Sequence, residues 1–195
     1  MRVRLRAMSI WAVVLLGGLA SAWGEQAAPV KRPDAPNLAP FVPSPEEVVD
    51  RMLRLAKVDK RDVVFDLGSG DGRIVIAAAA TFGARGVGVD IDPQRIAESV
   101  ANAKAAGVAD RVSFKLQDAM TTDLSEATVV TLYLLSSSNL KLRPILTKQL
   151  KPGARIVAHA FSMGDWPPDA VDTFTDSAGA TRTLYLWKAD GKVRP

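Results

Sequence analysis

The chain contains no cysteine and a single histidine, His159. Without cysteine it can form no disulfide framework, no thiolate nucleophile and no cysteine-based zinc site. One histidine also leaves few ligands for a transition metal. We therefore expect no metal centre in this protein.

Long hydrophobic segments are also scarce. The longest apolar run covers residues 7–20, and its roughly 14 residues fall short of the ~20 that a membrane-spanning helix needs. Three arginines precede this run and small residues follow it. We therefore predict that residues 1–24 form a secretory signal peptide, with an N-terminal membrane anchor as the alternative, and that the protein is exported to the periplasm or secreted.

Without residues 1–24 the chain has no large excess of basic or acidic residues. The full chain carries 25 basic and 21 acidic residues, and removal of the three N-terminal arginines leaves 22 basic residues against 21 acidic ones. No run of Lys or Arg alternates with aromatic residues, so we expect no nucleic-acid partner. The length of 195 residues and the hydrophobic content of 48% indicate one soluble domain.

Proline marks the boundary of that domain. Residues 25–40 are rich in proline, which favours an extended linker and disfavours helix. We predict a linker over 25–40 and a folded domain over 41–190. Ser44 is a candidate N-cap, with Pro45 at the first helical position and Glu47 completing a capping box.

After this first helix, β-branched runs alternate with helical segments. This order predicts an α/β fold, a Rossmann-like, doubly wound and mostly parallel seven-stranded sheet. The last two runs flank a short glycine-containing turn and predict a C-terminal antiparallel hairpin. The predicted strands cover residues 62–66, 86–90, 111–115, 128–135, 155–160, 171–176 and 181–188, and the predicted helices cover Gly72–Thr81, Pro93–Ala106 and Asn139–Gln149.

The sequence "DLGSGDGR", residues 66–73, follows the first predicted strand. Its glycines indicate close approach of a ligand to the backbone, at the strand end where such sheets bind ligands. Phosphate fits poorly, because Asp66 and Asp71 would repel it, and the third glycine comes one position too early for the nicotinamide fingerprint. A compact ligand with an amino group and a sulfonium, S-adenosylmethionine, suits both the bare backbone and the negative charge.

Two further aspartates follow predicted strands. Asp90 ends the second strand, where a carboxylate can accept both ribose hydroxyls, and Asp118 follows the third strand, where it can accept from the adenine amino group. Each acid also has a purely local interpretation, since Asp71 can cap a helix, Asp90 can be a loop acid and Asp118 can form a turn. The predicted cofactor-binding residues are Asp66, Gly68, Ser69, Gly70, Asp71, Asp90, Ile91, Asp118 and Ala119.

Over residues 41–188 the sequence resembles the class I, seven-strand methyltransferases. More narrowly, it resembles the protein-lysine methyltransferases related to the mitochondrial enzymes that modify the ATP synthase c subunit and the adenine nucleotide translocase. The glycine loop is typical of methyltransferases in general, whereas the first and last matching segments carry the narrower resemblance. The matching segments are "PFVPSPEEVVDRML", "VVFDLGSGDGRIVIAAA", "GARGVGVDIDPQRI", "SEATVVTLYLL" and "MGDWPPD".

The resemblance implies that S-adenosylmethionine is the cofactor and that a lysine amine enters beside Tyr133 and residues 41–45. A lysine amine with a pKa near 10.4 needs about 4.6 kcal/mol to become neutral at pH 7, and burial can supply this without a base. We hypothesise that Tyr133 is the catalytic residue that orients the amine. His159 is the alternative as a general base, or a structural histidine. The predicted substrate contacts are Phe41, Pro43, Ser136 and Trp166.

The sequence therefore predicts an S-adenosylmethionine-dependent methyltransferase that acts on a protein lysine, with a protein substrate as partner and membrane contact only through the N-terminal segment. A small-molecule methyltransferase is one alternative. The other is an exported, non-catalytic binding module that keeps the fold, because "AHAF" at 158–161 lacks the acidic residue that the resemblance leads us to expect after the histidine.

Overall fold

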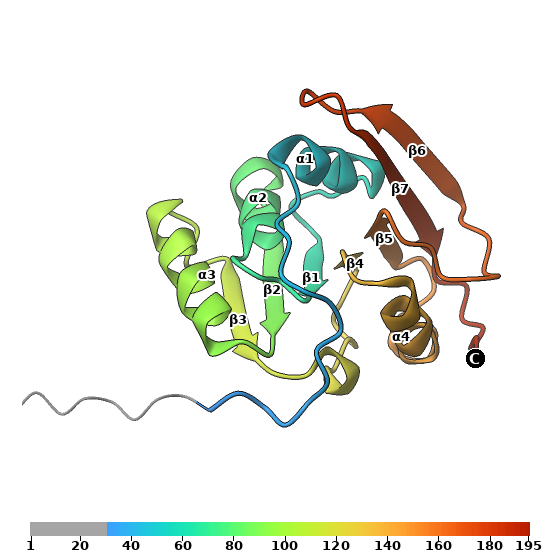
Figure 1. The fold of residues 1–195 in the computed structure, drawn as a ribbon, viewed down its shortest axis with the longest axis horizontal. Coiled ribbons are helices and arrows are strands. Elements are labelled where there is room, and N and C mark those ends of the chain that lie inside the picture. The colour runs from blue at the N-terminus through green and yellow to red at the C-terminus, as the bar shows by residue number, and fades with distance from the viewer. Residues whose placement is uncertain (1–30) are drawn as a thin grey trace, which may run out of the picture.

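The computed structural model describes residues 31–195, so the predicted signal peptide and residues 25–30 of the predicted linker lie outside the described part. Helices and strands alternate along the chain as far as β5, after which two further strands follow without a helix (Figure 1). The strands are β1 (Val63–Leu67), β2 (Arg85–Asp90), β3 (Val112–Leu116), β4 (Val129–Leu132), β5 (Arg155–His159), β6 (Ala170–Thr175) and β7 (Thr181–Lys188), and the helices are α1 (Glu46–Leu55), α2 (Arg73–Phe82), α3 (Pro93–Ala105), the short 3-10 helix η1 (Ala119–Thr121) and α4 (Ser136–Gln149).

All seven strands form one sheet in the order β3-β2-β1-β4-β5-β7-β6. Strands β1 to β5 are parallel, whereas β7 runs antiparallel to both of its neighbours. The chain moves outward from β1 to β3 and then returns to β4, so the strand order reverses between β1 and β4. These findings confirm the predicted fold, including the C-terminal hairpin, and they place the expected ligand site at the β1–β4 reversal.

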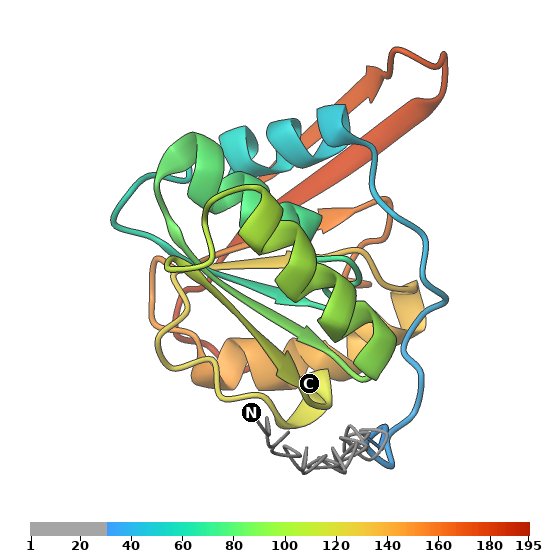
Figure 2. The ribbon, with the colours of Figure 1, turned by 90° about the vertical axis from the view of Figure 1, so that its left-hand side faces the viewer.

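Helices cover both faces of the sheet (Figure 2). Helices α1, α2 and α3 lie on one face, and α4 lies on the other. Successive strand residues point to opposite faces, so Val64 of β1 joins the core beneath α1 and α2, whereas Phe65 joins the core beneath α4. Every residue of β1 is buried, as expected for the central strand of a doubly covered sheet.

Some local predictions need correction. Helix α4 begins at Ser136, three residues before the predicted start at Asn139. Ser44 is not the cap of α1, because Pro45 occupies the N-cap position without a side-chain hydrogen bond. The Ser44 hydroxyl instead contacts His159. Glu47 completes no capping box, since its carboxylate accepts from the backbone N–H of Ser177.

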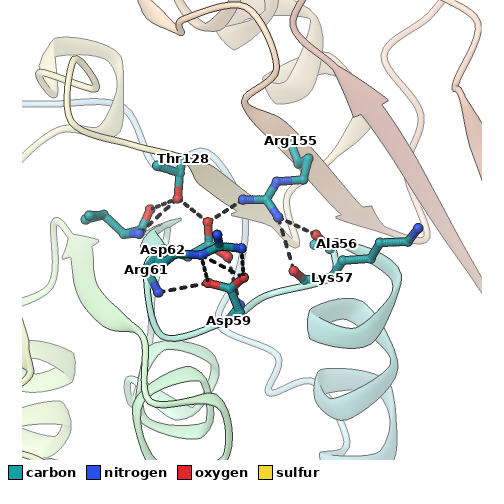
Figure 3. Close-up of polar contacts among 8 residues, drawn as sticks. Ala56, Lys57, Asp59, Arg61, Asp62, Thr128 and Arg155 are labelled. Carbon is teal, nitrogen blue, oxygen red and sulfur yellow. Dashed lines mark hydrogen bonds and ion pairs between the residues drawn. The ribbon is translucent and has the colours of Figure 1, made fainter.

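A buried polar network holds the amino ends of the strands together (Figure 3). Arg155 at the start of β5 forms an ion pair with Asp62, just before β1. Thr128, just before β4, donates to the same carboxylate over 2.7 Å. Arg155 also donates to the backbone carbonyl of Ala56, at the end of α1, over 2.8 Å. This network therefore joins α1 to three neighbouring strands.

Residues 31–44, which we call the N-terminal strap, lie along the opposite edge, where the parallel strands end (Figure 2). The strap contains neither helix nor strand, as the predicted linker implies, but it contacts the domain at several points. Ser138 of α4 donates to the backbone carbonyl of Leu38, and Arg73 donates to that of Ser44 over 2.8 Å. Among residues 31–195, no helix is both long and apolar enough to cross a membrane.

Candidate active site

A pocket lies at the carboxyl ends of the central strands, between the strap and the sheet. The glycine loop, residues 66–73, forms one wall and the strap forms the facing wall. The loops after β2, β3 and β4 contribute Asp90, Asp118 and Tyr133. The structure therefore brings together, in one pocket, side chains that follow four different strands.

Three glycines with positive φ shape the first wall. Gly68 has φ +82°, Gly70 has φ +54° and Gly72 has φ +81°, a region that other L-residues rarely adopt. A Cβ atom on Gly70 would lie 2.4 Å from the Phe41 ring of the strap. Both the backbone conformation and the nearness of the Phe41 ring therefore disfavour a side chain at position 70, and the strap contacts the loop there.

Asp66 is the buried acid of this wall, with 3% of its surface exposed. Thr131 of β4 donates to its Oδ1 over 2.8 Å. Burial raises the pKa of Asp66 to about 7, and the neighbouring charges of Asp90 and Asp71 act in the same direction. Within residues 31–195, no Lys or Arg forms an ion pair with this carboxylate, so its ionised form favours a cationic ligand.

Asp90 holds the glycine loop against the end of β2. Its Oδ2 accepts from the backbone N–H of Gly70 over 2.9 Å, and its Oδ1 accepts from the backbone N–H of Asp92 over 2.9 Å. Its neighbour Ile91 also lines the pocket. Asp90 is thus an ordered acid facing the pocket, which accords with a role in binding ribose hydroxyls.

Asp71 and Asp118 both make local contacts. Gly72 rather than Asp71 occupies the N-cap position of α2, but Asp71 Oδ1 accepts from the backbone N–H of Arg73, the first residue of that helix, over 3.3 Å. Asp71 also forms an ion pair with Arg73 over 2.6 Å; burial raises the pKa of Asp71, but the hydrogen bonds and charge of Arg73 outweigh this and lower it. Asp118 accepts from the backbone N–H of Met120 and caps η1, as the local interpretation expected. Both acids still line the pocket, and so does Ala119.

Three aromatic rings lie together where the acceptor is predicted to enter. Tyr133 lines the pocket, and the centroid of its ring lies 4.0 Å from that of His159 and 6.4 Å from that of Phe161. His159 has 1% of its surface exposed. Its Nδ1 lies 3.3 Å from the hydroxyl of Ser44. Burial, together with the charge of Arg182, lowers the pKa of His159 to about 4, so the ring is neutral at pH 7.

The predicted substrate contacts fall in different places. Phe41 and Pro43 line the pocket from the strap, whereas Ser136 and Trp166 do not line it. Ser136 is an exposed residue at the start of α4. Trp166 is buried against Trp187, whose ring nitrogen donates to the Trp166 backbone carbonyl over 3.0 Å. The structure therefore gives Trp166 a packing role between the loop after β5 and the terminal strand.

Sequence reasoning did not assign Arg73, Arg95 or Leu134 to the pocket, yet all three line it. The Arg95 guanidinium lies 4.6 Å from the centroid of the Phe41 ring, a cation–π distance. Arg73 is the last residue of the glycine loop, and this position could have indicated a place in the pocket. Arg95 carried no signal, because its contact with the strap depends on the fold.

The residues present fit a cationic adenosine-containing ligand that bears no phosphate. Carboxylates surround the glycine loop, and burial raises the pKa of one of them. The Ser69 hydroxyl is buried and has no partner among residues 31–195, which leaves a polar group available to a ligand. Nor do the described residues contain a cluster of three or more acidic or histidine side chains that could hold a metal ion.

Comparison with known protein families shows the family to which this chain belongs. A family model, the ANTKMT methyltransferase domain, matches residues 66–170, which is more than half of the chain. The chain belongs to the ANTKMT methyltransferase family. It is therefore an S-adenosylmethionine-dependent methyltransferase, and the predicted cofactor is confirmed.

Individual relatives of this ANTKMT-family chain differ in the acceptors that their names state. A protein-lysine N-methyltransferase of Saccharolobus islandicus (strain REY15A) is 47% identical over 149 residues, covering 76% of this chain and 92% of the relative. The human lysine N-methyltransferase of the ATP synthase c-subunit is 32% identical over 132 residues, covering 68% of this chain and 56% of the human protein. A Salinibacter ruber protein described as an RNA methyltransferase, solved with S-adenosyl-L-homocysteine, is 56% identical with a TM-score of 0.73, covering 78% of this chain and 97% of that one.

Proposed function

We propose that this methyltransferase transfers the cofactor's methyl group to the side-chain amine of a lysine in a protein. The observation that carries the proposal is the aromatic acceptor side: Tyr133 lines the pocket, and His159 and Phe161 lie behind it. Aromatic rings bind the stem and the cationic head of a lysine. The names of the Saccharolobus islandicus and human relatives support the same acceptor.

The chain's own residues bind and orient the two reactants. Asp66, Asp90 and Asp118 would hold the cofactor with the glycine loop, and the bound cofactor supplies an activated methyl group. A lysine amine needs about 4.6 kcal/mol to become neutral at pH 7, and removal of the amine from water beside the Tyr133 ring would supply part of this by disfavouring the charged form. Tyr133 would orient the neutral amine for in-line attack, which is chiefly a positioning effect.

His159 is a poor general base in this arrangement. It is buried, it does not line the pocket, and its Nδ1 is already engaged with Ser44. The amine proton would therefore pass to solvent water as the lysine enters the site, before methyl transfer, and not to a dedicated base.

Methyl-labelled cofactor would test the proposal with two acceptor pools from the same bacterial cells, an alkaline-washed protein extract and total RNA. The expected result is label in protein that acid hydrolysis recovers as methyl-lysine, with a Tyr133→Phe variant at least about 10-fold slower. Label in RNA or in free small molecules would overturn the protein-lysine assignment. Equal rates for Tyr133→Phe and the unaltered chain would overturn only the role of Tyr133.

We also propose, from residues 1–24 alone, that the protein is exported, and we propose the domain boundaries 41–190. Fractionation of cells that express the full chain tests the first point. Recovery in the periplasm or medium, with residues 1–24 removed, is the expected result, and recovery in the cytosol would overturn it.

A further inference from the structure

A chain of contacts runs from the glycine loop to the acceptor side of the pocket. Asp71 forms an ion pair with Arg73 over 2.6 Å, and Arg73 donates to the backbone carbonyl of Ser44 over 2.8 Å. The hydroxyl of Ser44 lies 3.3 Å from Nδ1 of His159, and the His159 ring lies against Tyr133. These contacts connect the cofactor wall to the residue expected to orient the acceptor.

The Tyr133 ring depends on this packing for its orientation. Within residues 31–195 its hydroxyl makes no hydrogen bond, so no polar contact fixes the ring. The His159 ring, 4.0 Å away between centroids and tilted by 33°, is its nearest aromatic neighbour. The His159 ring therefore packs more closely on Tyr133 than the Phe161 ring does, whose centroid lies 6.4 Å away.

His159 is itself held through Ser44. Both side chains are buried, with 1% and 3% of their surfaces exposed, and each offers the other a hydrogen-bond partner. Loss of either one would leave a polar group buried without a partner, which costs far more than an exposed hydrogen bond. The pair is therefore ordered; Ser44 lines the pocket from the strap, whereas His159 does not line it.

We propose that Ser44 and His159 are positioning residues that hold the Tyr133 ring in the orientation needed for methyl transfer, and that Arg73 links them to the cofactor wall. The proposal rests on the proposed function, because it assumes that Tyr133 contacts the acceptor. His159, which does not line the pocket, acts through Tyr133, and the Ser44 hydroxyl acts through its contact with His159.

The first test needs no acceptor. His159 is the only histidine of the chain, so its ring is the sole imidazole signal in an NMR spectrum of the full protein. In the unaltered protein we expect one tautomer and ring-proton shifts moved by the Tyr133 ring. Ser44→Ala should mix the tautomers, Ser44→Thr should restore one tautomer, and Tyr133→Leu should remove the ring-induced shifts.

Ser138→Ala is the matched control. Ser138 is another buried serine whose hydroxyl contacts the strap, at Leu38 rather than at His159. This variant should leave the His159 tautomer unchanged. Unaltered His159 signals in Ser44→Ala and Tyr133→Leu would overturn the proposal, even if the protein transferred methyl groups to no lysine.

The second test uses kinetics with labelled cofactor and the alkaline-washed protein extract. Ser44→Ala should lower kcat about 10-fold while the calorimetric Kd for S-adenosylmethionine changes less than about 2-fold, because the pair acts on the methyl-transfer step. Ser44→Thr should recover most of the rate. Equal losses in kcat for Ser44→Ala and Ser44→Thr would contradict the positioning role.

Substitution of both partners separates positioning from proton transfer. His159→Phe keeps a ring beside Tyr133 but strands the Ser44 hydroxyl, and the double variant with Ser44→Ala replaces the pair by apolar groups. The double variant should therefore be faster than either single variant. A double variant that is at least about 100-fold slower than the unaltered protein, with the stability of the unaltered protein, would show that His159 acts as a base and would overturn the proposal.

Discussion

Two buried aspartates at the two ends of the first strand have different surroundings. Asp62 precedes β1 and Asp66 lies within it, and each accepts from a threonine of the β4 segment. Asp62 also forms an ion pair with Arg155, whereas Asp66 has only acidic neighbours as charged partners in the part of the chain that the structure describes. The fold pairs Asp62 with a cation, whereas Asp66, which lines the pocket, has no cationic partner among the described residues.

This difference separates stability from function along one strand. At the amino end the charges are paired and join α1 to three strands (Figure 3). At the carboxyl end, burial without a cation raises the pKa of Asp66 to about 7. The carboxyl end therefore carries an energetic cost that a cationic cofactor can relieve.

The largest expected effect follows from breaking the ion pair at the amino end. Arg155→Met should lower the free energy of unfolding by about 3–5 kcal/mol, because it leaves Asp62 buried without its cation. Urea unfolding measures this change. Arg61→Met, which removes the exposed Arg61–Asp59 pair, is the control and should cost no more than about 1 kcal/mol. Equal losses in the free energy of unfolding for the two variants would mean that the buried ion pair stabilises the protein no more than an exposed one.

The Asp66→Asn variant removes the charge at the carboxyl end of the strand, and it should change how the stability of the protein depends on pH. A carboxylate with a raised pKa favours the folded state at low pH, and this contribution is lost as pH rises from about 4 through about 7. Over that range the unaltered protein should lose stability relative to Asp66→Asn, by a few kcal/mol at most.

Cofactor binding should show the opposite trend. The ionised form of Asp66 attracts the cationic cofactor, so the calorimetric Kd of the unaltered protein should tighten as pH rises through about 7, whereas Asp66→Asn should bind weakly at every pH. Asp123→Asn, a change at an exposed loop acid, is the control. A Kd for the unaltered protein that does not change between about pH 6 and pH 8 would rule out this role for Asp66.

Alanine substitution of one glycine at each end of the sheet should have a smaller effect. Gly70 lies at the carboxyl end against Phe41, whereas Gly107 precedes β3 at the amino end, and a Cβ atom there would have no neighbour within 4 Å. Both have positive φ, so alanine at either site should cost about 1 kcal/mol in stability. Only Gly70→Ala should also weaken cofactor binding, by displacing Phe41. Calorimetry on both variants decides this, and equal Kd values would show that contact with the strap is unimportant.

Much of the fold could be predicted because its signals are local. Hydrophobic runs of strand length alternate with helical segments, and "DLGSGDGR" follows the first run, so the parallel sheet and the position of the glycine loop follow directly. Asp66, Asp90 and Asp118 each end or follow a strand, and parallel strands bring their carboxyl ends to one edge. Tyr133 was identified through the resemblance to the lysine methyltransferases, and the structure places it directly after β4.

Other assignments depended on contacts that no local pattern encodes. "PSPEE" has the composition of a capping box, yet Ser44 bonds to His159, 115 positions further along the chain. Trp166 was predicted to contact the substrate because it is a large aromatic residue in a loop, yet it is buried against Trp187. In both cases burial of the side chain against a segment distant in the sequence stabilises the fold more than the local alternative would.

The sequence by itself therefore determined the order of strands and helices, the glycine loop and the acids beside it, because periodicity and strand ends are properties of short segments. Only the tertiary structure decided which polar groups became partners. Arg155 pairs with Asp62 across 93 positions, while Asp66 on the same strand is left without a cation. That choice belongs to the fold, because burial makes an unpaired charge costly and only the folded chain determines which groups are buried together.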